Sequence, residues 1–278
     1  MQCEIMEQTG TAWKHFISYG DPGTNFVRPE ILQSWQRCYK IGVNPYDGNS
    51  HKILPQDKLK DLLERKSKLI SIARPLMTTL YDFVRGSGFI VMLTDENSYI
   101  MEALGDPEIL ASACRLNFVP GGCWSEEQVG TNAIATAIEV GIPLQVSGEE
   151  HYCQKHHAWT CSGAPIYDDN NQIIGVLDMS GPSSETHKHT LGMVVAAVQD
   201  IRDQLHLHKN NQELSMANDS LSSIFMNISE GVILVDETAR IKAVNPVAES
   251  ILGQRVEDYK MSALKDILGK ETPFTQEM

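Results

Sequence analysis

The segment from Cys123 to Gly181 carries the pattern that decides the fold: CWSEEQVGTNAIATAIEVGIPLQVSGEEHYCQKHHAWTCSGAPIYDDNNQIIGVLDMSG. It brings two tryptophans, three cysteines and three histidines into a run of alternating helix and strand patterns. Its second half holds two strand-like runs, SGAPIYD and QIIGVLDMS, joined by the polar residues Asp169, Asn170 and Asn171. The segment therefore predicts a β-hairpin, and we expect whatever the protein senses to act on or through it.

The residues before this segment predict a second hairpin. The apolar run Phe89–Leu93 and a second run over Tyr99–Ala103 flank the polar turn DEN at 95–97. A short helix is expected over PEILASACRLN, a helix rich in small residues over EEQVGTNAIATAIEVG, and a third strand over IPLQVS. This order predicts an α+β fold, with a mainly antiparallel sheet and helices on one side of it.

Three helical patterns lie outside the predicted sheet. The first covers RPEILQSWQRCYKIG, after a polar stretch over residues 1–25 that predicts a loop. The second runs over residues 57–85 and contains Pro75, which should kink or divide it. The third covers residues 186–228, and its apolar seam takes a six-residue step after His208 that predicts a local unwinding or a jog.

Apolar residues at heptad-like spacing on the second and third of these helices predict a subunit interface. Long helices of this kind commonly pair with a second copy of the chain. The candidate interface residues are Leu69, Leu76, Leu80, Val194, Val198, Ile201 and Leu205. We therefore predict a homodimer whose seam is a four-helix bundle made by two chains.

Composition and charge exclude several classes of protein. The chain has 278 residues, 42% of them hydrophobic, which is enough for two domains with buried cores. Its net charge of −13 argues against direct contact with nucleic acid, which needs clustered Lys and Arg. No apolar run approaches the length of a membrane span, and no signal pattern is present at the N-terminus. We expect a cytoplasmic protein whose six cysteines are reduced thiols.

Four ordered blocks resemble a known family of proteins. They are RPEIxxSWxRC at 28–38, WSEExxGTNAIxTA at 124–137, HxWxCSxAPIxD at 157–168 and GVLDMSG at 175–181. They are similar to the N-terminal sensory region of bacterial enhancer-binding-type activators related to the acetoin catabolism regulator. In that family the last three blocks belong to a GAF domain. The segment from about 221, with GVILVD and IKAVNPVAE, resembles the first half of a PAS domain.

The resemblance implies a division of the chain into four parts. They are an N-terminal helical segment over 1–80, a GAF-like domain over 81–190, a linking and dimerisation helix over 191–226, and the first half of a PAS-like domain over 227–278. The last part is too short for a whole domain of this kind, so we expect the chain to end within it. In the family an AAA+ ATPase and a helix-turn-helix domain follow, and this sequence contains no G-x-x-x-x-G-K-[ST] loop.

The resemblance also implies a partner. The family includes regulators of dihydroxyacetone kinase operons, and similarity to them implies that subunits of dihydroxyacetone kinase bind this region and deliver the signal. Such a site needs an exposed patch with aromatic or apolar anchors, and no catalytic group or cofactor. The candidate surfaces are the loop 121–128 and the helices over 57–85 and 186–210.

A small-molecule pocket is the alternative, because GAF and PAS folds often enclose one between sheet and loops. The residues expected near such a pocket are Trp124, Asn132, His151, Trp159, Ser162 and Asp178. Each also has an ordinary structural explanation: the tryptophans as core, the asparagine as a polar group at a helix start, and the aspartate as a strand-end cap.

The thiols and imidazoles leave two chemical alternatives open. His151, Cys153, His157 and Cys161 follow the spacing H-x-C-x3-H-x3-C, and each residue type can bind zinc or take part in redox sensing. The spacing lacks the paired C-x-x-C of strong zinc sites, so we favour a structural role and predict no metal. Some GAF-fold proteins are methionine sulfoxide reductases, for which Cys123 would join the two other cysteines, but we predict that this chain is not an enzyme.

Overall fold

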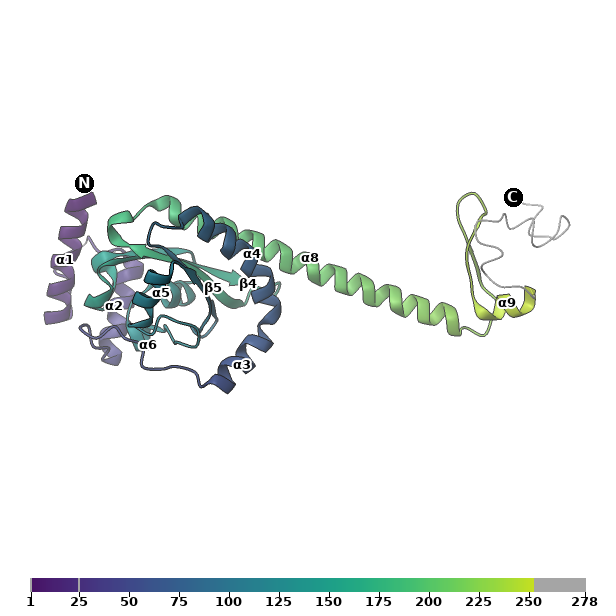
Figure 1. The fold of residues 1–278 in the computed structure, drawn as a ribbon, viewed down its shortest axis with the longest axis horizontal. Coiled ribbons are helices and arrows are strands. Elements are labelled where there is room, and N and C mark those ends of the chain that lie inside the picture. The colour runs from purple at the N-terminus through teal and green to yellow at the C-terminus, as the bar shows by residue number, and fades with distance from the viewer. Residues whose placement is uncertain (1, 25, 253–278) are drawn as a thin grey trace. The chain divides into compact units, whose positions relative to one another are not determined.

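The computed structural model describes residues 2–24 and 26–252 of the chain (Figure 1). The chain divides into two compact units, Met1–Leu207 and His208–Met278, and each is described by itself. The predicted PAS-like segment is described as far as residue 252, so the rest of it lies outside the described residues. No helix in the described part of the chain is both long enough and apolar enough to cross a membrane.

Five antiparallel strands form the sheet of the first unit, in the order β2-β1-β5-β4-β3. The strands are β1 (Ile90–Asp95), β2 (Ile100–Gly105), β3 (Leu144–Ser147), β4 (Trp159–Tyr167) and β5 (Ile173–Pro182). Both predicted hairpins are confirmed, as β1–β2 and β4–β5, and the pairing of β1 with β5 joins them into one sheet. The predicted strand over IPLQVS is β3, which pairs with β4 at the sheet edge. The α+β fold class is confirmed.

Helices cover both faces of this sheet, which corrects the expectation of helices on one side. Helices α4 (Ser67–Val84) and α8 (Lys188–Asn227) cover one face, and α5 (Pro107–Cys114) and α7 (Ala133–Val140) pack on the other. Strand β1 explains the difference, because every one of its residues is buried. A strand that is buried on both sides reads as a continuous apolar run. Val91 belongs to the layer under α4, and its neighbour Met92 to the layer under α5.

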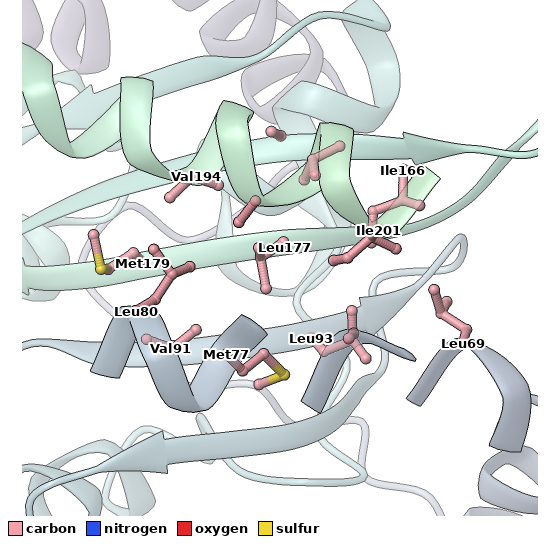
Figure 2. Close-up of a cluster of buried hydrophobic side chains, with 14 of the residues drawn as sticks. Leu69, Met77, Leu80, Val91, Leu93, Ile166, Leu177, Met179, Val194 and Ile201 are labelled. Atoms are coloured by element: carbon pink, nitrogen blue, oxygen red, sulfur yellow. The ribbon is translucent and has the colours of Figure 1, made fainter. Parts of the chain in front are cut away.

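The face under α4 and α8 is an apolar layer (Figure 2). Its labelled members are Leu69, Met77, Leu80, Val91, Leu93, Ile166, Leu177, Met179, Val194 and Ile201. Burial of these side chains is the main source of stability for such a layer, at about 25 cal/mol for each Å² of apolar surface removed from water.

The residues that we expected at a subunit interface lie in this layer. Leu69, Leu80, Val194, Val198 and Ile201 are buried within the chain, and Leu76 and Leu205 are partly buried against the same cluster. Their heptad-like spacing therefore reflects packing of two helices on their own sheet. The five buried side chains are not available to a second copy of the folded chain, which corrects their assignment to a dimer seam, whereas the partly buried Leu76 and Leu205 keep accessible surface.

The predicted loop over residues 1–25 is wrong, because helix α1 (Gln2–Tyr19) takes up most of this range. Ala12, Trp13 and Phe16 are almost fully buried and pack with the residues of α2 (Pro29–Ile41). Their spacing places them on one helical face, but few other apolar residues extend the stripe. Helix α2 is confirmed as predicted.

The predicted helix over residues 57–85 is divided, but not at Pro75. Helix α3 (Gln56–Arg65) is followed by a single residue, Lys66, after which α4 begins, and Pro75 lies inside α4. The Lys66 ammonium pairs with Glu96 in the β1–β2 turn and donates to the carbonyl oxygen of Ile174 at 3.1 Å. This side chain ties the junction between the two helices to the sheet, which explains why the break falls there.

Helix α8 is continuous over 40 residues, so the predicted jog after His208 is absent. Its apolar stripe changes face instead. Val198 and Ile201 are buried, whereas Leu214 and Leu221 are 61% and 64% exposed. In an α-helix a step of six residues leaves the following side chains about 120° away from the preceding stripe. The phase shift in the sequence therefore marks a change of environment along a regular helix.

The described part of the second unit confirms the predicted strand–turn–strand–helix order. It contains β6 (Ile233–Val235), β7 (Ile241–Val244) and α9 (Pro246–Leu252). The two strands are antiparallel. Asn245 is fully buried at the start of α9, where its Oδ1 accepts from the backbone N–H of Val232 at 2.8 Å and of Ala248 at 2.9 Å. This asparagine therefore caps the helix and holds it against the strands.

Candidate functional site

Two of the sequence blocks meet in a buried polar network that joins α2 to the GAF-like sheet domain. Glu126, at the start of α6 (Glu126–Val129), accepts two hydrogen bonds from Arg37 on α2, both at 2.7 Å. Its Oε1 also accepts from the hydroxyls of Ser34 at 2.5 Å and Thr136 at 3.0 Å. The hydroxyls of Ser34 and Thr131 lie 2.6 Å apart. The carboxylate is only 7% exposed, and its four donors supply the hydrogen bonds that burial requires.

Gly130 and Asn132 break the single helix that we predicted over 126–140 into α6 and α7. Gly130 has φ 71° and ψ −166°, and a Cβ there would lie 2.8 Å from the Cβ of Tyr152, so a side chain does not fit. Asn132 is the N-cap of α7, with Oδ1 accepting from the backbone N–H groups of Ile134 and Ala135 at 3.0 Å each. The WSEExxGTN block thus builds a tight corner against the loop that carries Tyr152.

The loop over residues 148–157, which carries the histidines, is held from outside by the N-terminal segment. The indole Nε1–H of Trp35 donates to the carbonyl oxygen of Glu150 at 2.8 Å, and that of Trp13 donates to the carbonyl oxygen of Tyr152 at 2.9 Å. Arg28 pairs with the Glu150 carboxylate at 2.8 Å. The first block, RPEIxxSWxRC, therefore contacts both the loop and the network around Glu126.

The same loop forms one wall of a small internal cavity of about 10 Å³. The cavity is lined by Leu116, Phe118, Trp124, His151, His156, Trp159 and Cys161. The His156 ring stacks on Trp124, with the ring centroids 5.2 Å apart. Ligand sites for drug-sized molecules usually have about 300–1,000 Å³. As described, this cavity holds at most a water-sized occupant.

Burial keeps both histidines of the cavity neutral. Loss of hydration lowers the pKa of His151 to about 3 and that of His156 to about 4. The Nε2 of His151 lies 3.4 Å from the Sγ of Cys161, and its Nδ1 lies 3.0 Å from the carbonyl oxygen of Gly148. The Nε2 of His156 lies 2.7 Å from the carbonyl oxygen of Gly48, while its buried Nδ1 has no partner.

A second buried polar group lies on the same sheet face. Asp178 is fully buried, and its Oδ2 accepts from the Ser180 hydroxyl at 2.6 Å, while its Oδ1 has no partner. Desolvation raises the pKa of Asp178 to about 7. Ser180 pairs with Cys161 across the β4–β5 ladder, which places the Asp178 carboxyl beside the cavity wall and not in it.

The six residues predicted for a pocket are only partly brought together. Trp124, His151 and Trp159 line the cavity, and Asp178 lies behind its wall on the same face. Asn132 caps α7 and fixes the main chain near Trp124, since its Nδ2 donates to that residue's carbonyl oxygen at 3.1 Å. Ser162 pairs with Met179 of the apolar layer, so it lies on the opposite face, where its hydroxyl accepts from Gln145 at 2.9 Å.

Sequence reasoning missed His156 as a pocket residue and the pairing of Arg37 with Glu126. Arg37 lies inside one family-like block and His156 directly before another, but their partners lie far away in the sequence. Arg37 and Glu126 are 89 residues apart, and His156 and Gly48 are 108 apart. Spacing within a block cannot indicate contacts at that distance. The signal that could have suggested the ion pair was the opposite charge of the two blocks. RPEIxxSWxRC contains Arg37, and WSEE contains Glu126.

The thiols of this region are buried and poorly suited to ionise. Desolvation raises the pKa of Cys38 and of Cys153 to about 12, and raises that of Cys161 well above its usual range. The Sγ of Cys153 faces the carbonyl oxygen of Asn44 at 3.5 Å. Within the described residues no group of three or more His, Cys, Asp or Glu side chains has the geometry to hold a metal ion.

Two surface hollows flank the β1–β2 turn, with volumes of about 540 and 580 Å³. Residues of α3 border the first, and residues of α2, α6 and α7 border the second. Asn97 and Tyr99 line both hollows, and the ammonium of Lys52 lies over the Tyr99 ring, 5.6 Å from its centroid. The turn is therefore a ridge between two recesses of the size that a partner's side chains could fill.

The sequence matches known families over most of its length. Residues 7–203 match the MimR N-terminal domain, and residues 220–276 match a PAS domain. The chain belongs to the MimR N-terminal domain family. This family assignment covers the network around Glu126, the loop over 148–157 and the cavity, and it confirms the resemblance to activators of the acetoin regulator type. The match to a PAS domain confirms the resemblance of the segment from about 221 to such a domain.

Two similar proteins are transcriptional regulators by name. The chain is 36% identical over 228 residues to a signal-transduction and transcriptional-control protein of Clostridium beijerinckii, covering 82% of this chain and 36% of that protein. It is 34% identical over 204 residues to the acetoin dehydrogenase operon transcriptional activator AcoR of Bacillus subtilis strain 168, covering 73% of this chain and 34% of that protein. The chain thus spans about a third of the length of these relatives.

A solved structure has the same fold as this member of the MimR N-terminal domain family. The structure of the E. coli DhaR(N)-DhaL complex matches with a TM-score of 0.80 over 90% of this chain and 85% of that chain. The sequences are 20% identical, so the likeness concerns the fold alone. It supports the predicted order of a helical segment, a GAF-like sheet domain, a long helix and the start of a PAS-like domain.

Proposed function

We propose that this chain is the sensory region of a cytoplasmic transcription activator, which binds a protein partner and passes the signal to AAA+ and DNA-binding domains of the whole protein. The small volume of the interior cavity carries the proposal. A cavity of about 10 Å³ leaves no room for a metabolite in the described conformation, whereas the surface offers hollows of about 540 and 580 Å³. The names of the relatives support the regulatory role, and the fold shared with DhaR(N), solved with DhaL, supports a protein partner.

The partners we propose are subunits of a dihydroxyacetone kinase, and the ridge between the two hollows is the surface we propose for them. Asn97 is exposed at the tip of the β1–β2 turn, and Tyr99 offers an aromatic anchor beside it. Both hollows carry charges of both signs, among them Lys58 and Asp61 in one and Lys40 and Glu127 in the other. Such mixed charges favour a polar rim around a small apolar centre.

A matched pair of turn variants tests this surface. Asn97 donates its backbone N–H to Asp95, and Asn170 does the same to Asp168 in the β4–β5 turn, at 3.0 and 2.9 Å. Asn97→Arg should reduce binding of purified kinase subunits at least tenfold, by calorimetry, because a long charged side chain enters the recesses. Asn170→Arg should bind as the wild type does. Equal binding by both variants, or no binding by the wild-type chain, contradicts the proposal.

We also propose that the chain is a homodimer. Its interface would lie on the exposed part of α8 and not in the apolar layer under α4 and α8. Leu214, Ala217, Leu221 and Ile224 follow heptad spacing on the exposed part of α8, and Leu221 and Ile224 are 64% and 62% exposed. Leu221→Asp should give monomers in light scattering. Met216→Asp, at a residue that is 67% exposed and outside this spacing, should leave the dimer intact. A dimeric Leu221→Asp variant contradicts this seam.

A non-enzymatic role is part of the proposal. A sulfoxide reductase needs a thiolate nucleophile, and burial raises the pKa of Cys153 and Cys161 far above neutral pH. The purified chain should therefore not reduce methionine sulfoxide in the presence of a thiol reductant. Turnover that is lost in Cys161→Ser would contradict this part of the proposal.

Sensing of a small molecule by the GAF-like domain is a second candidate, favoured by one observation. The Nδ1 of His156 is buried in a residue of the cavity wall and has no hydrogen-bond partner. An unpaired buried nitrogen costs roughly 1–3 kcal/mol, and such groups often mark a place where a ligand or water completes the hydrogen bonding.

A further inference from the structure

Tyr167, the last residue of β4, contacts helices that lie on opposite faces of the sheet. Its hydroxyl donates to the carbonyl oxygen of Gly141, directly after α7, at 2.6 Å. The guanidinium of Arg202 on α8 lies over its ring, 5.6 Å from the centroid. A β-bulge between Ile166 and Tyr167 shifts the register against β5, and such bulges redirect side chains. This one side chain therefore connects the two helix layers past the end of β4.

The contact at Gly141 leads to the larger of the two surface hollows. That hollow, of about 580 Å³, is bordered on α7 by Ala135, Ile138 and Glu139. Gly141 ends α7 with a φ of 68°, and a Cβ there would lie 3.0 Å from the hydroxyl oxygen of Tyr167. The close approach of the hydroxyl thus depends on the missing side chain. A group that displaces α7 from the side of the hollow would move the acceptor of this hydrogen bond.

Two contacts from the β4–β5 hairpin reach α8 where the helix leaves the sheet. Ile201 is fully buried in the apolar layer, whereas Leu207 is 60% exposed (Figure 2). Between them Arg202 stacks on the tyrosine ring, and the Nδ1 of His206 lies 3.1 Å from the carboxylate of Asp169 in the turn. Polar contacts as exposed as this ion pair contribute little stability, so a small displacement is enough to exchange them. They determine the orientation of α8 at this point without locking it.

We propose that Tyr167 is a positioning residue, which transmits a displacement of α7 to α8 where α8 leaves the sheet. The inference rests on the proposed partner binding beside the second hollow and names the route by which a bound partner would act on the helix. Apolar packing of α8 on the sheet is non-directional, whereas a hydrogen bond fixes the tyrosine ring at a defined angle. Because α8 is continuous to Asn227, a rotation at Arg202 would extend along the helix to the proposed dimer interface.

Hydrogen exchange over residues 202–210 of α8 tests this contact without any partner. Tyr167→Phe keeps the aromatic ring and removes the donor to Gly141, so the ring is no longer held against Arg202. Exchange over 202–210 should become at least about threefold faster, while exchange in β1 stays as in the wild type. An unchanged rate over 202–210, or an equal increase in β1, would overturn the proposal.

Tyr81→Phe is a closely matched control. The Tyr81 hydroxyl donates to the Asp106 carboxylate at 2.6 Å, and the guanidinium of Arg85 lies 5.2 Å from the ring centroid. The control therefore removes the same kind of hydrogen bond from the same kind of ring, near the end of α4 and away from α8. Exchange over 202–210 should stay as in the wild type. A similar increase in both variants would mean that the effect on α8 is not specific to Tyr167, and the proposal would fail.

A double-mutant cycle tests whether Tyr167 acts through Arg202. Arg202→Gln removes the cation over the ring and should also accelerate exchange over 202–210. Adding Tyr167→Phe to it should change the rate little further, because the two contacts act in series. Fully additive effects of the two substitutions contradict this route.

Purified kinase subunits separate this inference from the proposed function. Their binding to the wild-type chain should change the exchange rate over 202–210. Tyr167→Phe should bind them with the same affinity by calorimetry but lose that change in exchange. An equal change in both proteins overturns the role of Tyr167, whereas absence of binding to the wild-type chain contradicts the proposed partner binding.

Discussion

The two faces of the central sheet differ in how their buried atoms are satisfied. The face under α4 and α8 is packed with aliphatic and thioether side chains. The face under α5 and α7 contains or adjoins all three buried side-chain atoms without a partner in the described residues. They are Thr94 Oγ1, His156 Nδ1 and Asp178 Oδ1.

This difference indicates a division of roles within one domain. Apolar packing is non-directional, and it stabilises the sheet without specifying any particular contact. Unpaired polar atoms lower stability, and native proteins contain few of them. We infer that the face under α4 and α8 provides most of the stability, and that the opposite face keeps groups whose function outweighs their cost. The following predictions test this comparison, from the largest expected effect to the smallest.

Charging the apolar face should unfold the domain. Val198→Asp places a carboxylate where the side chain is only 6% exposed, and the free energy of unfolding should fall by roughly 4 kcal/mol or more. Val195→Asp makes the same change three residues earlier, where the side chain is 39% exposed, and should cost less than about 0.5 kcal/mol. Thermal denaturation followed by circular dichroism measures both. A folded, monomeric Val198→Asp variant would instead favour a subunit seam at this face.

Removing the buried acid of the opposite face should change how stability depends on pH. The pKa of Asp178 is raised to about 7 in the folded chain, whereas an unfolded aspartate titrates near 4. Between these values the folded state binds more protons than the unfolded state, so its contribution to stability is full below pH 4 and is lost as the pH rises towards 7. The slope approaches about 1.4 kcal/mol per pH unit.

Asp178→Asn should abolish this loss, because the amide does not titrate. The variant should match the wild type near pH 4 and exceed its stability at pH 8, by denaturant unfolding at each pH. The histidines of the cavity titrate in both proteins, so the difference between the two curves isolates the carboxyl. Cys161, which pairs with Ser180 on the neighbouring strand, stays neutral because burial raises its pKa. A constant difference between the two proteins from pH 4 to 8 contradicts the assignment.

Breaking the ion pair that joins α2 to the sheet domain should have an intermediate effect. Glu126→Gln leaves the guanidinium of Arg37 without its anionic partner and removes two charge-assisted hydrogen bonds, at a cost of about 2 kcal/mol. Glu127→Gln alters the adjacent, exposed residue and should be neutral within about 0.5 kcal/mol. Urea denaturation compares them. Similar stabilities for the two variants would mean that the network contributes little.

The smallest effect is expected from a single outer hydrogen bond. Trp35→Phe loses the indole donor to Glu150 and part of the packing of a fully buried ring, and should lower stability by about 1–2 kcal/mol. Hydrogen exchange should accelerate in the loop over 148–157 more than in the sheet, since the lost bond holds that loop. A uniform increase of the hydrogen-exchange rate throughout the domain would indicate a general loss of packing. It would contradict the proposed difference between the two faces.

The sequence predicts the apolar face better than the polar one, and the reason is physical. Hairpins, helix α2 and the strands of the second unit follow from local periodicity and turn residues, which a window of about ten residues contains. The periodic apolar residues of α4 and α8 also follow from the sequence. Periodicity indicates that one face of a helix is buried, but it does not indicate which element covers that face. Val198 was therefore assigned to a partner copy, although its own sheet covers it.

The candidate site depends on contacts that no local pattern contains. Trp124, His151 and Trp159 were expected near a pocket of the kind that GAF folds enclose, and the structure places all three at the cavity. Ser162 was expected there too, but neighbouring residues of a strand point to opposite faces, and Ser162 lies on the face away from Cys161. The unpaired nitrogen of His156 depends on Gly48, which no spacing rule connects to it.

The bare backbone at Gly130 has a consequence for how this domain tolerates change. Any side chain there would meet the Cβ of Tyr152 at 2.8 Å and the sulfur of Cys153 at 3.2 Å, in a conformation with positive φ. The position contributes no charge, donor or apolar surface of its own, yet it sets how closely the corner before α7 approaches the histidine-bearing loop. If every residue is replaced in turn and transcriptional regulation is measured, Gly130 should therefore tolerate replacement as poorly as the buried tryptophans do. The reason is that neighbouring side chains occupy the space that its own side chain would need.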